Sequence, residues 1–166
     1  MSVNIALLTV TDTRTLETDK SGNILVEKIN KAKHNLVERK ICKDNKEDIK
    51  TILKEWTHKK DLDVIITTGG TGLTGRDITP EALDEIADKH IPGFGEIFRY
   101  YSLETVGTSS IQSRACAILS NGKYIFALPG SSGGVTDAWD KILIHQLDIN
   151  HKPCNFVELF PRLKEK

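Results

Sequence analysis

Two glycine-rich segments contain the residues best suited to bind an anion. Thr67–Gly72 reads Thr-Thr-Gly-Gly-Thr-Gly, and Leu128–Gly134 reads Leu-Pro-Gly-Ser-Ser-Gly-Gly. Each follows a short run rich in apolar β-formers, Asp63–Ile66 and Tyr124–Ala127. Glycine allows backbone N–H groups to approach a ligand with no side chain in between. Two such turns at the carboxyl ends of parallel strands would line one crevice, which predicts a phosphate-bearing small molecule as the ligand.

Three aspartates are placed where strands are expected to end or a helix to begin. Asp12 closes the first apolar run, Asp44 follows the second predicted strand, and Asp77 precedes a predicted helix. Each also fits the ordinary role of a turn or helix-capping residue, and that interpretation stays open. In a parallel sheet the strand ends converge, so we expect these carboxylates to face the crevice. There Asp77 would hold Mg²⁺ together with substrate phosphates.

Three better-known motifs do not fit these segments. Gly70–Gly75 matches G-x-G-x-x-G, but the next helix opens only at Thr79 and no strand follows at the required distance, which argues against a dinucleotide fingerprint. Arg76-Asp77 replaces the Lys-Ser/Thr pair of a P-loop. Gly130–Gly133 lacks the G-x-S-x-G pattern of a nucleophile elbow. One glycine turn alone fits a tight bend equally well, whereas two favour anion binding.

A further polar cluster contains three serines and an arginine at a probable helix start. Arg114 could place its guanidinium fork on a phosphate, or it could be solvated or form an ion pair within the protein. The serines of the second glycine segment would donate hydrogen bonds to an anion near the following helix start. The residues predicted to contact the substrate are Asp12, Thr68, Gly69, Gly70, Thr71, Gly72, Ser109, Ser110, Ser113, Arg114, Pro129, Gly130, Ser131 and Ser132.

Strand-like and helix-like segments alternate along most of the chain. This order predicts a three-layer α/β/α sandwich with a mainly parallel central sheet, to which the Asn121-Gly122 turn adds an antiparallel hairpin strand. The predicted strands are Val3–Val10, Leu36–Lys43, Asp63–Thr68, Ala117–Ser120 and Tyr124–Leu128. The first three predicted helices lie near residues 21–33, after the cap Asp44-Asn45, and after an N-cap at Thr79. Pro92–Gly95 is predicted to interrupt the helical pattern. Three further helices are predicted over Glu96–Leu103, Ser109–Ala115 and Val135–Gln146. Asn155–Phe160 is predicted as an edge strand or an arm.

Composition limits the classes of partner. The chain of 166 residues has 23 Lys plus Arg and 23 Asp plus Glu, so its formal net charge is zero. This balance argues against nucleic acid as a partner. The apolar runs are too short to span a bilayer, so no membrane partner is expected. No linker or repeat is visible, which predicts one domain over residues 1–166 with residues 151–166 as a C-terminal tail or arm.

The cysteines and the amino terminus indicate the compartment. Cys42, Cys116 and Cys154 are widely separated and lack the spacing of a metal knuckle, so they fit reduced thiols. Met1–Ile5 enters a strand pattern at once and carries no basic segment of the kind that starts a secretion signal. We therefore expect a cytoplasmic protein.

Several long motifs in a fixed order resemble the molybdenum cofactor biosynthesis family of MoaB and MogA type. The likeness extends from the Val10-Thr11-Asp12 strand end to the Pro153-Cys154-Asn155-Phe156 tail, and the tail and the stretch around Phe94 are closer to the MoaB branch. The motifs that carry it are Thr68–Gly72, Arg76–Ala82, Pro92–Glu96, Ser113–Ala115 and Leu128–Ser131.

This resemblance implies a molybdopterin-binding α/β/α domain that assembles as a trimer or, in the MoaB branch, a hexamer. It implies transfer of AMP from Mg²⁺-bound ATP to the terminal phosphate of molybdopterin, with Asp44 and Asp77 as catalytic and metal-binding residues. ATP is then a co-substrate, and the molybdate-insertion enzyme is a further expected partner. Two alternatives stay open: a molybdopterin-binding protein or scaffold without turnover, and a generic nucleotide-binding subunit.

Overall fold

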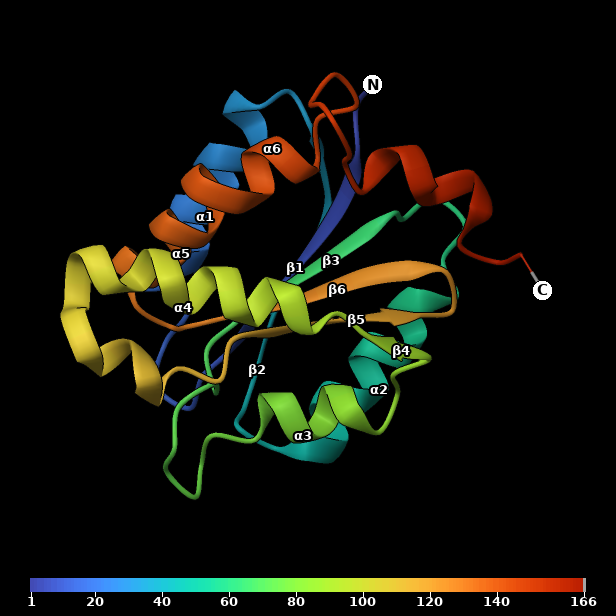
Figure 1. The fold of residues 1–166 in the computed structure, drawn as a ribbon. Coiled ribbons are helices and arrows are strands. Elements are labelled where there is room, and N and C mark those ends of the chain that lie inside the picture. Colours follow the sequence, from blue (N-terminus) through green and yellow to red (C-terminus); the bar gives the residue numbers. More distant parts are fainter. Residues whose placement is uncertain (166) are drawn as a thin grey trace.

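A single six-stranded sheet organises the computed structural model, which describes residues 1–165. The strand order is β2-β1-β3-β6-β5-β4 (Figure 1). Strands β2, β1, β3 and β6 pair in parallel, whereas β5 pairs antiparallel with both β6 and β4. The strands are β1 (Asn4–Val10), β2 (Asn35–Cys42), β3 (Val64–Thr68), β4 (Lys89–His90), β5 (Cys116–Ser120) and β6 (Lys123–Leu128). The mainly parallel α/β fold predicted from the sequence is confirmed.

The central strands are apolar because both of their faces are covered. Leu7 of β1 pairs with Ile66 of β3, which pairs with Phe126 of β6, and all three side chains are fully buried. The edge strand β2 is only partly buried and carries charged residues such as Glu38 and Arg39. The sequence of β2 is therefore less apolar than that of the central strands.

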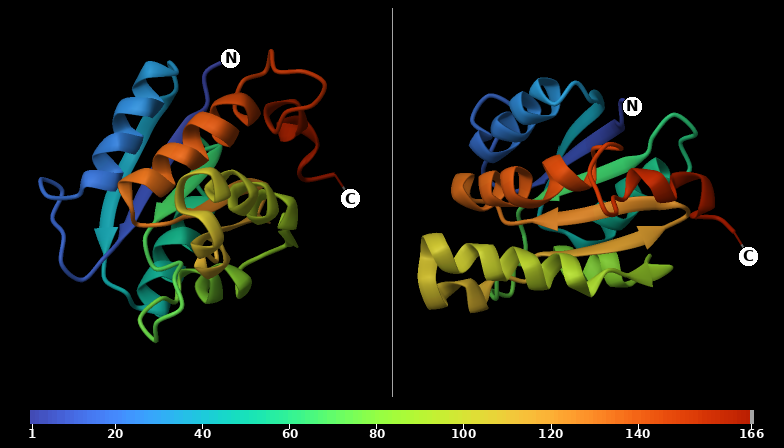
Figure 2. Two further views of the ribbon diagram at one scale, coloured as in Figure 1. Left: turned by 60° about the vertical axis from the view of Figure 1, so that its left-hand side comes forward. Right: turned by 45° about the horizontal axis from the view of Figure 1, so that its top comes forward.

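Helices cover the sheet on two sides (Figure 2). On one face α1 (Lys20–Lys31), α4 (Pro92–Val106) and α5 (Ser132–Ala138) pack over side chains such as Leu7 and Phe126. On the other face α2 (Lys46–Thr57) and α3 (Thr79–Asp84) pack over Leu8 and Ile65. Each face therefore has its own apolar core, with the sheet between the two cores.

The hairpin between β5 and β6 follows the prediction. Asn121 and Gly122 have φ values of 48° and 72°. Two consecutive positive φ values are what a tight two-residue turn between antiparallel strands requires, and Asn-Gly is the dipeptide that adopts them most readily. The turn places β5 beside β6 and so completes the sheet on that side.

Several element boundaries differ from the predicted ones. Pro92 begins α4 rather than interrupting a helix, because proline at the first helical position needs no N–H partner. The cap of α3 is Ile78, one residue before the predicted Thr79. The segment predicted as a helix over Ser109–Ala115 is a 3-10 helix over Gly107–Gln112, and the two-residue β4 gave no recognisable pattern.

The carboxyl-terminal part of the chain also departs from prediction. The predicted long helix is α5, then a π-helical turn over Trp139–Leu143, then α6 (Ile144–Gln146). The predicted edge strand or arm is a 3-10 helix over Val157–Arg162. Its position follows from aromatic packing, since the ring of Phe156 lies 4.6 Å from that of Tyr124 in β6. Such a contact over a long sequence distance cannot be read from local periodicity.

In residues 1–165, none of the helices has both the length and the apolar character needed to cross a membrane.

A buried ion pair joins α1 to β1 and β2. Asp19 caps α1 by accepting a hydrogen bond from the Gly22 amide at 2.9 Å, and it also accepts bonds from Thr9 Oγ1 at 2.6 Å and Arg39 Nη2 at 3.0 Å. Burial disfavours the charged form of Asp19, but these hydrogen bonds and the Arg39 charge outweigh it and lower the pKa. The ionised carboxylate therefore stabilises the folded chain.

Asp19→Asn should lower the free energy of unfolding at pH 7 by about 2–3 kcal/mol, because Arg39 loses its partner in a mostly buried position. Since the Asp19 pKa is lower in the folded chain, its contribution is present at neutral pH and lost in acid. The difference between variant and parent should shrink below about pH 4. Urea unfolding across pH measures it, with exposed Asp61→Asn as the control. A difference that stays constant with pH would contradict this role.

Candidate functional site

The two glycine turns lie against each other where β3 and β6 end. The Gly69 amide donates to the Leu128 carbonyl at 3.0 Å, and Thr68 Oγ1 donates to the Pro129 carbonyl at 2.8 Å. A Cβ added to Gly130 would lie 3.3 Å from the Gly69 Cα. The two segments that the sequence predicted to share a crevice are therefore neighbours in space.

Glycine is required in the first turn for two separate reasons. Gly69 has a φ of +101°, and a Cβ there would lie 2.2 Å from the Val10 carbonyl oxygen. Gly70 has a φ of +68°, and its Cβ would lie 2.4 Å from Thr79 Oγ1. Both positions combine a backbone conformation that L-residues rarely adopt with a contact that leaves no room for a side chain.

The carbonyl groups of this turn accept hydrogen bonds from residues that lie outside the cavity described below. The Thr79 amide donates to Gly70 O at 3.0 Å, Thr79 Oγ1 donates to Gly69 O at 2.9 Å, and the Arg114 amide donates to Thr71 O at 2.9 Å. Within residues 1–165 the amides of Gly70 and Thr71 have no hydrogen-bond partner. The turn thus keeps its acceptors occupied and its donors free, which is the arrangement of an anion-binding backbone.

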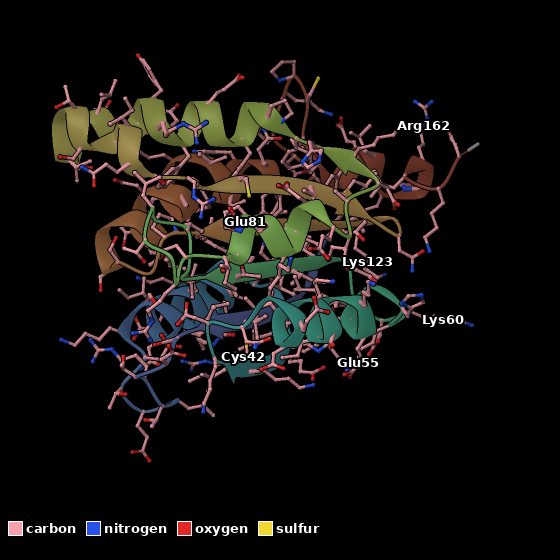
Figure 3. The ribbon with its side chains drawn as sticks, turned by 90° about the horizontal axis from the view of Figure 1, so that it is seen from below. Cys42, Glu55, Lys60, Glu81, Lys123 and Arg162 are labelled. Carbon is pink, nitrogen blue, oxygen red and sulfur yellow. The ribbon has the colours of Figure 1, made fainter. Side chains whose placement is uncertain are left out.

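Arg114 holds the loop that follows the turn. Its Nε donates to Gly72 O at 2.7 Å, its Nη2 donates to Asp77 O at 2.7 Å, and its Nη1 pairs with Glu81 of α3, labelled in Figure 3. The guanidinium therefore bonds to the protein itself, and Arg114 does not line the cavity described next. Of the two predicted interpretations, the structure shows the internal ion pair.

A cavity of about 1160 Å³ opens over the two turns. Twelve of the fourteen predicted contact residues line it, together with both predicted catalytic aspartates; the exceptions are Arg114 and Thr68, whose side chain is fully buried beneath the turn. The predicted residues that line the cavity are Asp12, Asp44, Gly69, Gly70, Thr71, Gly72, Asp77, Ser109, Ser110, Ser113, Pro129, Gly130, Ser131 and Ser132.

Part of one wall of the cavity was not predicted. It comes from α4, the end of the 3-10 helix after it and the end of α5, and it includes Phe98, Ser102, Thr105, Gln112 and Asp137. These residues occupy ordinary helix positions in the sequence, so no local motif marked them. Only the packing of α4 beside α5 brings them to the strand ends.

The two predicted catalytic aspartates face the cavity in different electrostatic states. Burial and then the negative charge of Asp77 raise the pKa of Asp44. Burial also opposes ionisation of Asp77, but hydrogen bonds from the Thr74 hydroxyl and the amides of Thr74 and Gly72, with the Arg114 charge, lower its pKa. The Thr74 bonds measure 2.7 Å from Oγ1 and 2.9 Å from the amide. The surroundings therefore favour the ionised form of Asp77 and disfavour that of Asp44.

The Asp12 carboxylate bonds to two other residues of the site, Asp44 and Arg76. Its Oδ1 accepts the Asp44 amide at 3.1 Å, and its Oδ2 pairs with Arg76. The loop after β1 is thereby joined to the end of β2 and to the loop before α3. This contact fixes Asp44 at the cavity edge, where a Cβ on Gly70 would lie 3.5 Å from Asp44 Oδ1.

The donor set suits a cation that also binds substrate oxygens. Among residues 1–165 no group of three or more His, Cys, Asp or Glu side chains could enclose a metal ion. Asp44 and Asp77 supply oxygen ligands beside free backbone amides, and bringing a cation between them would relieve the repulsion that raises the Asp44 pKa. Mg²⁺ commonly binds in this way, through one or two carboxylates with water and phosphate oxygens.

The second turn begins α5. Ser131 is its N-cap, and Ser131 Oγ accepts the Gly134 amide at 3.1 Å. The amides of Ser132 and Gly133 precede the first intrahelical bonds and have no partner within residues 1–165. Ser131 therefore uses its hydroxyl oxygen as an acceptor for the helix, and the free donors beside it belong to the backbone.

Comparison with known proteins identifies relatives along nearly the whole chain. Residues 6–149 match a family model described as a probable molybdopterin binding domain. Molybdenum cofactor biosynthesis protein B of Escherichia coli (strain K12) is 44% identical over 161 residues, which cover 97% of this chain and 93% of that protein.

Solved structures give the same result. A crystal structure of molybdenum cofactor biosynthesis protein B superposes with a TM-score of 0.89 at 40% identity, covering 100% of this chain and 98% of that one. The tungsten cofactor synthesizing protein MoaB from Pyrococcus furiosus gives a TM-score of 0.76 at 35% identity, covering 86% and 91% of the two chains. The resemblance found in the sequence motifs is confirmed.

Arg114→Gln should loosen the loop between Gly72 and Asp77. Losing charged hydrogen bonds to two carbonyls and to Glu81 should cost about 2 kcal/mol of stability. Hydrogen exchange should accelerate at the amides of Thr74, Asp77 and Thr79, while the β-strand amides keep their protection. Arg162→Gln, far from this loop in Figure 3, is the control. Unchanged exchange in the loop would show that Arg114 does not hold it.

The coupling of the two aspartates can be measured directly. In Asp77→Asn the pKa of Asp44 should fall, because a negative neighbour is removed, yet it should stay above its ordinary value because burial remains. Carbon-13 NMR titration of the carboxyl groups follows this change. Asp84→Asn, outside the cavity, should leave the Asp44 pKa unchanged. An Asp44 pKa that is the same in Asp77→Asn and in the parent protein would contradict the proximity of the two groups.

Proposed function

The chain belongs to the family of probable molybdopterin binding domains that acts in molybdenum cofactor biosynthesis, and from this premise we propose that it is a molybdopterin adenylyltransferase. In this proposal the protein binds molybdopterin and ATP at the glycine turns and joins AMP to the terminal phosphate of the pterin. Mg²⁺ as cofactor and assembly into a trimer or hexamer are parts of the same proposal.

One observation carries the proposal: free amides from two turns and a pair of coupled carboxylates face one cavity. Gly70 and Thr71, after β3, and Ser132 and Gly133, after β6, line the same cavity, and their amides have no partner within residues 1–165. A cavity of about 1160 Å³ exceeds the usual size of a pocket for one drug-sized ligand, about 300–1,000 Å³. It therefore has room for a heterocycle together with phosphate groups.

The reaction is balanced without a covalent enzyme intermediate. An oxygen of the pterin phosphate attacks the α-phosphorus of ATP, a new P–O–P bond forms, the α–β bond breaks, and pyrophosphate leaves. The nucleophile is already an anion, so the site needs no strong general base. Burial raises the pKa of the Cys42 thiol to about 12 and that of Cys116 to about 11, which keeps both unreactive.

The main obstacle is bringing two anions together, and the site's residues address it by position and charge. The free amides would fix the two phosphate groups in line, which removes the entropic cost of their meeting. Asp44 and Asp77 would hold Mg²⁺, which supplies positive charge against the phosphate oxygens. Arg114, outside the cavity, keeps the loop before Asp77 in place, and Asp12, in the cavity wall, keeps Asp44 in place.

A binding protein without turnover is the second candidate, and one observation favours it. The Asp77 carboxylate already accepts three hydrogen bonds from its own loop, as a purely structural aspartate would. In that case molybdopterin would bind with no ATP-dependent product. The two candidates differ in whether Asp77 takes part in a reaction.

Incubation with molybdopterin, ATP and Mg²⁺ should yield adenylylated pterin and pyrophosphate in equal amounts. Asp77→Asn should slow this by about 100-fold or more, because an amide is a poor ligand for Mg²⁺. The Asn oxygen can still accept the Thr74 bonds, so the melting temperature should change little.

Asp84→Asn removes a carboxylate from the exposed side of α3 and is the matched control. Full turnover in Asp77→Asn would remove this residue from the mechanism. Pterin binding with no product, even at high protein concentration, would favour the second candidate.

A further inference from the structure

A second, smaller cavity adjoins the first at the glycine turns. Its volume is about 280 Å³, and it lies between the end of β1, the start of α1 and the turn before α5. The two cavities share wall residues, which are Val10, Thr11, Gly69, Gly130, Ser131 and Ser132. The two cavities therefore meet at the same part of the glycine turns.

The two cavities differ in charge. Asp12, Asp44, Asp77 and Asp137 line the large one, together with Arg76, which pairs with Asp12. Arg14 and Lys20 line the small one, and neither forms a salt bridge with any residue between 1 and 165. The small cavity thus presents uncompensated positive charge, and the large one presents mainly negative charge.

The single acid of the small cavity is already neutralised. Asp19 is only 1% exposed, and Thr9, Gly22 and Arg39 all donate hydrogen bonds to its carboxylate. A third cation, Arg39, which does not line the cavity, therefore balances this charge. Arg14 and Lys20 remain available to a ligand.

The volume of the small cavity and the positive groups around it limit the kind of ligand that can bind there. A volume of about 280 Å³ lies below the usual range for a drug-sized ligand, so a whole nucleotide does not fit but one or two phosphate groups do. Ser21 lines the cavity too, but its hydroxyl already donates to Asp19 Oδ1 at 3.3 Å. The helix α1 begins there, so the positive end of its dipole adds to the side-chain charge. Since no free carboxylate is present, an anion can bind there without a divalent cation.

We infer that the small cavity binds the diphosphate group of ATP and, after the reaction, the pyrophosphate that leaves. The inference rests on the proposed function for the identity of the nucleotide. It divides the substrates between the cavities: the pterin phosphate and the α-phosphate meet at the shared glycine wall, and the leaving group lies beside Arg14 and Lys20. The cationic cavity then stabilises the negative charge that develops on the leaving group when the α–β bond breaks.

Pyrophosphate alone, in the presence of EDTA, is the direct probe. Isothermal titration calorimetry should show that it binds without Mg²⁺, and binding should weaken as KCl is raised. Lys20→Gln combined with Arg14→Gln should weaken the affinity by at least about tenfold, since two charged hydrogen bonds are lost. Both residues are exposed, so the double variant should keep the parent melting temperature.

Matched controls locate the anion. Lys31→Gln changes an exposed lysine at the other end of α1 and should leave pyrophosphate affinity unchanged. Lys60→Gln tests the cations at the opposite end of the sheet, where Figure 3 shows Lys60 and Lys123, and should also have no effect. Asp77→Asn should not weaken binding, because Asp77 lines only the large cavity.

Three outcomes overturn the inference: no pyrophosphate binding in EDTA, an unchanged affinity in the Arg14 and Lys20 double variant, or binding that requires both Mg²⁺ and Asp44. The test is separate from that of adenylyl transfer. Lys20-dependent pyrophosphate binding with no adenylylated pterin would support the cavity and reject the reaction. Formation of adenylylated pterin with a pyrophosphate affinity that does not depend on Arg14 and Lys20 would support the reaction and reject the cavity.

Discussion

The close approach of two backbone turns is the constraint on which the site depends. Gly69 fits against the Val10 carbonyl on one side and Gly130 on the other, and a single added carbon at position 69 would lie 2.2 Å from that carbonyl oxygen. Because β1, β3 and β6 pair in parallel, their ends reach the same edge of the sheet. The sheet register therefore sets the distance between the free amides of the two turns. The side chains of the site supplement this backbone arrangement and do not create it.

Support for these turns comes from residues outside the cavity. Thr79 and Arg114 bond to the carbonyl side of the first turn, so the amide side is left to face the ligand. A peptide unit cannot rotate one of its groups without the other, and fixing the acceptors thus fixes the direction of the donors. A positioning arginine and a buried threonine hydroxyl keep the binding surface in place before any ligand arrives.

The sequence predicted the fold class and most of the cavity because both depend on local signals. Glycine turns after apolar strands and Asn121-Gly122 are short motifs with a direct physical meaning. The helical wall that contains Ser102 and Asp137 could not be predicted, since α4 and α5 meet only through tertiary packing. The sequence did not decide whether Arg114 binds a phosphate or forms an internal ion pair, because its partners Gly72 and Glu81 are distant in sequence. Element ends shifted for a similar reason, as at Thr79, whose hydroxyl bonds to a turn carbonyl instead of capping its own helix.

The place of β6 in the sheet has a consequence for how the chain is made. This strand is the last of the six strands in chain order, yet it lies in the interior of the sheet between β3 and β5. Until it leaves the ribosome, β3 has an unpaired apolar edge and the second turn does not exist. The nascent chain can therefore neither complete the cavity nor bury the two cores until β6 and the turn after it have emerged. That interval is when a chaperone would be needed most.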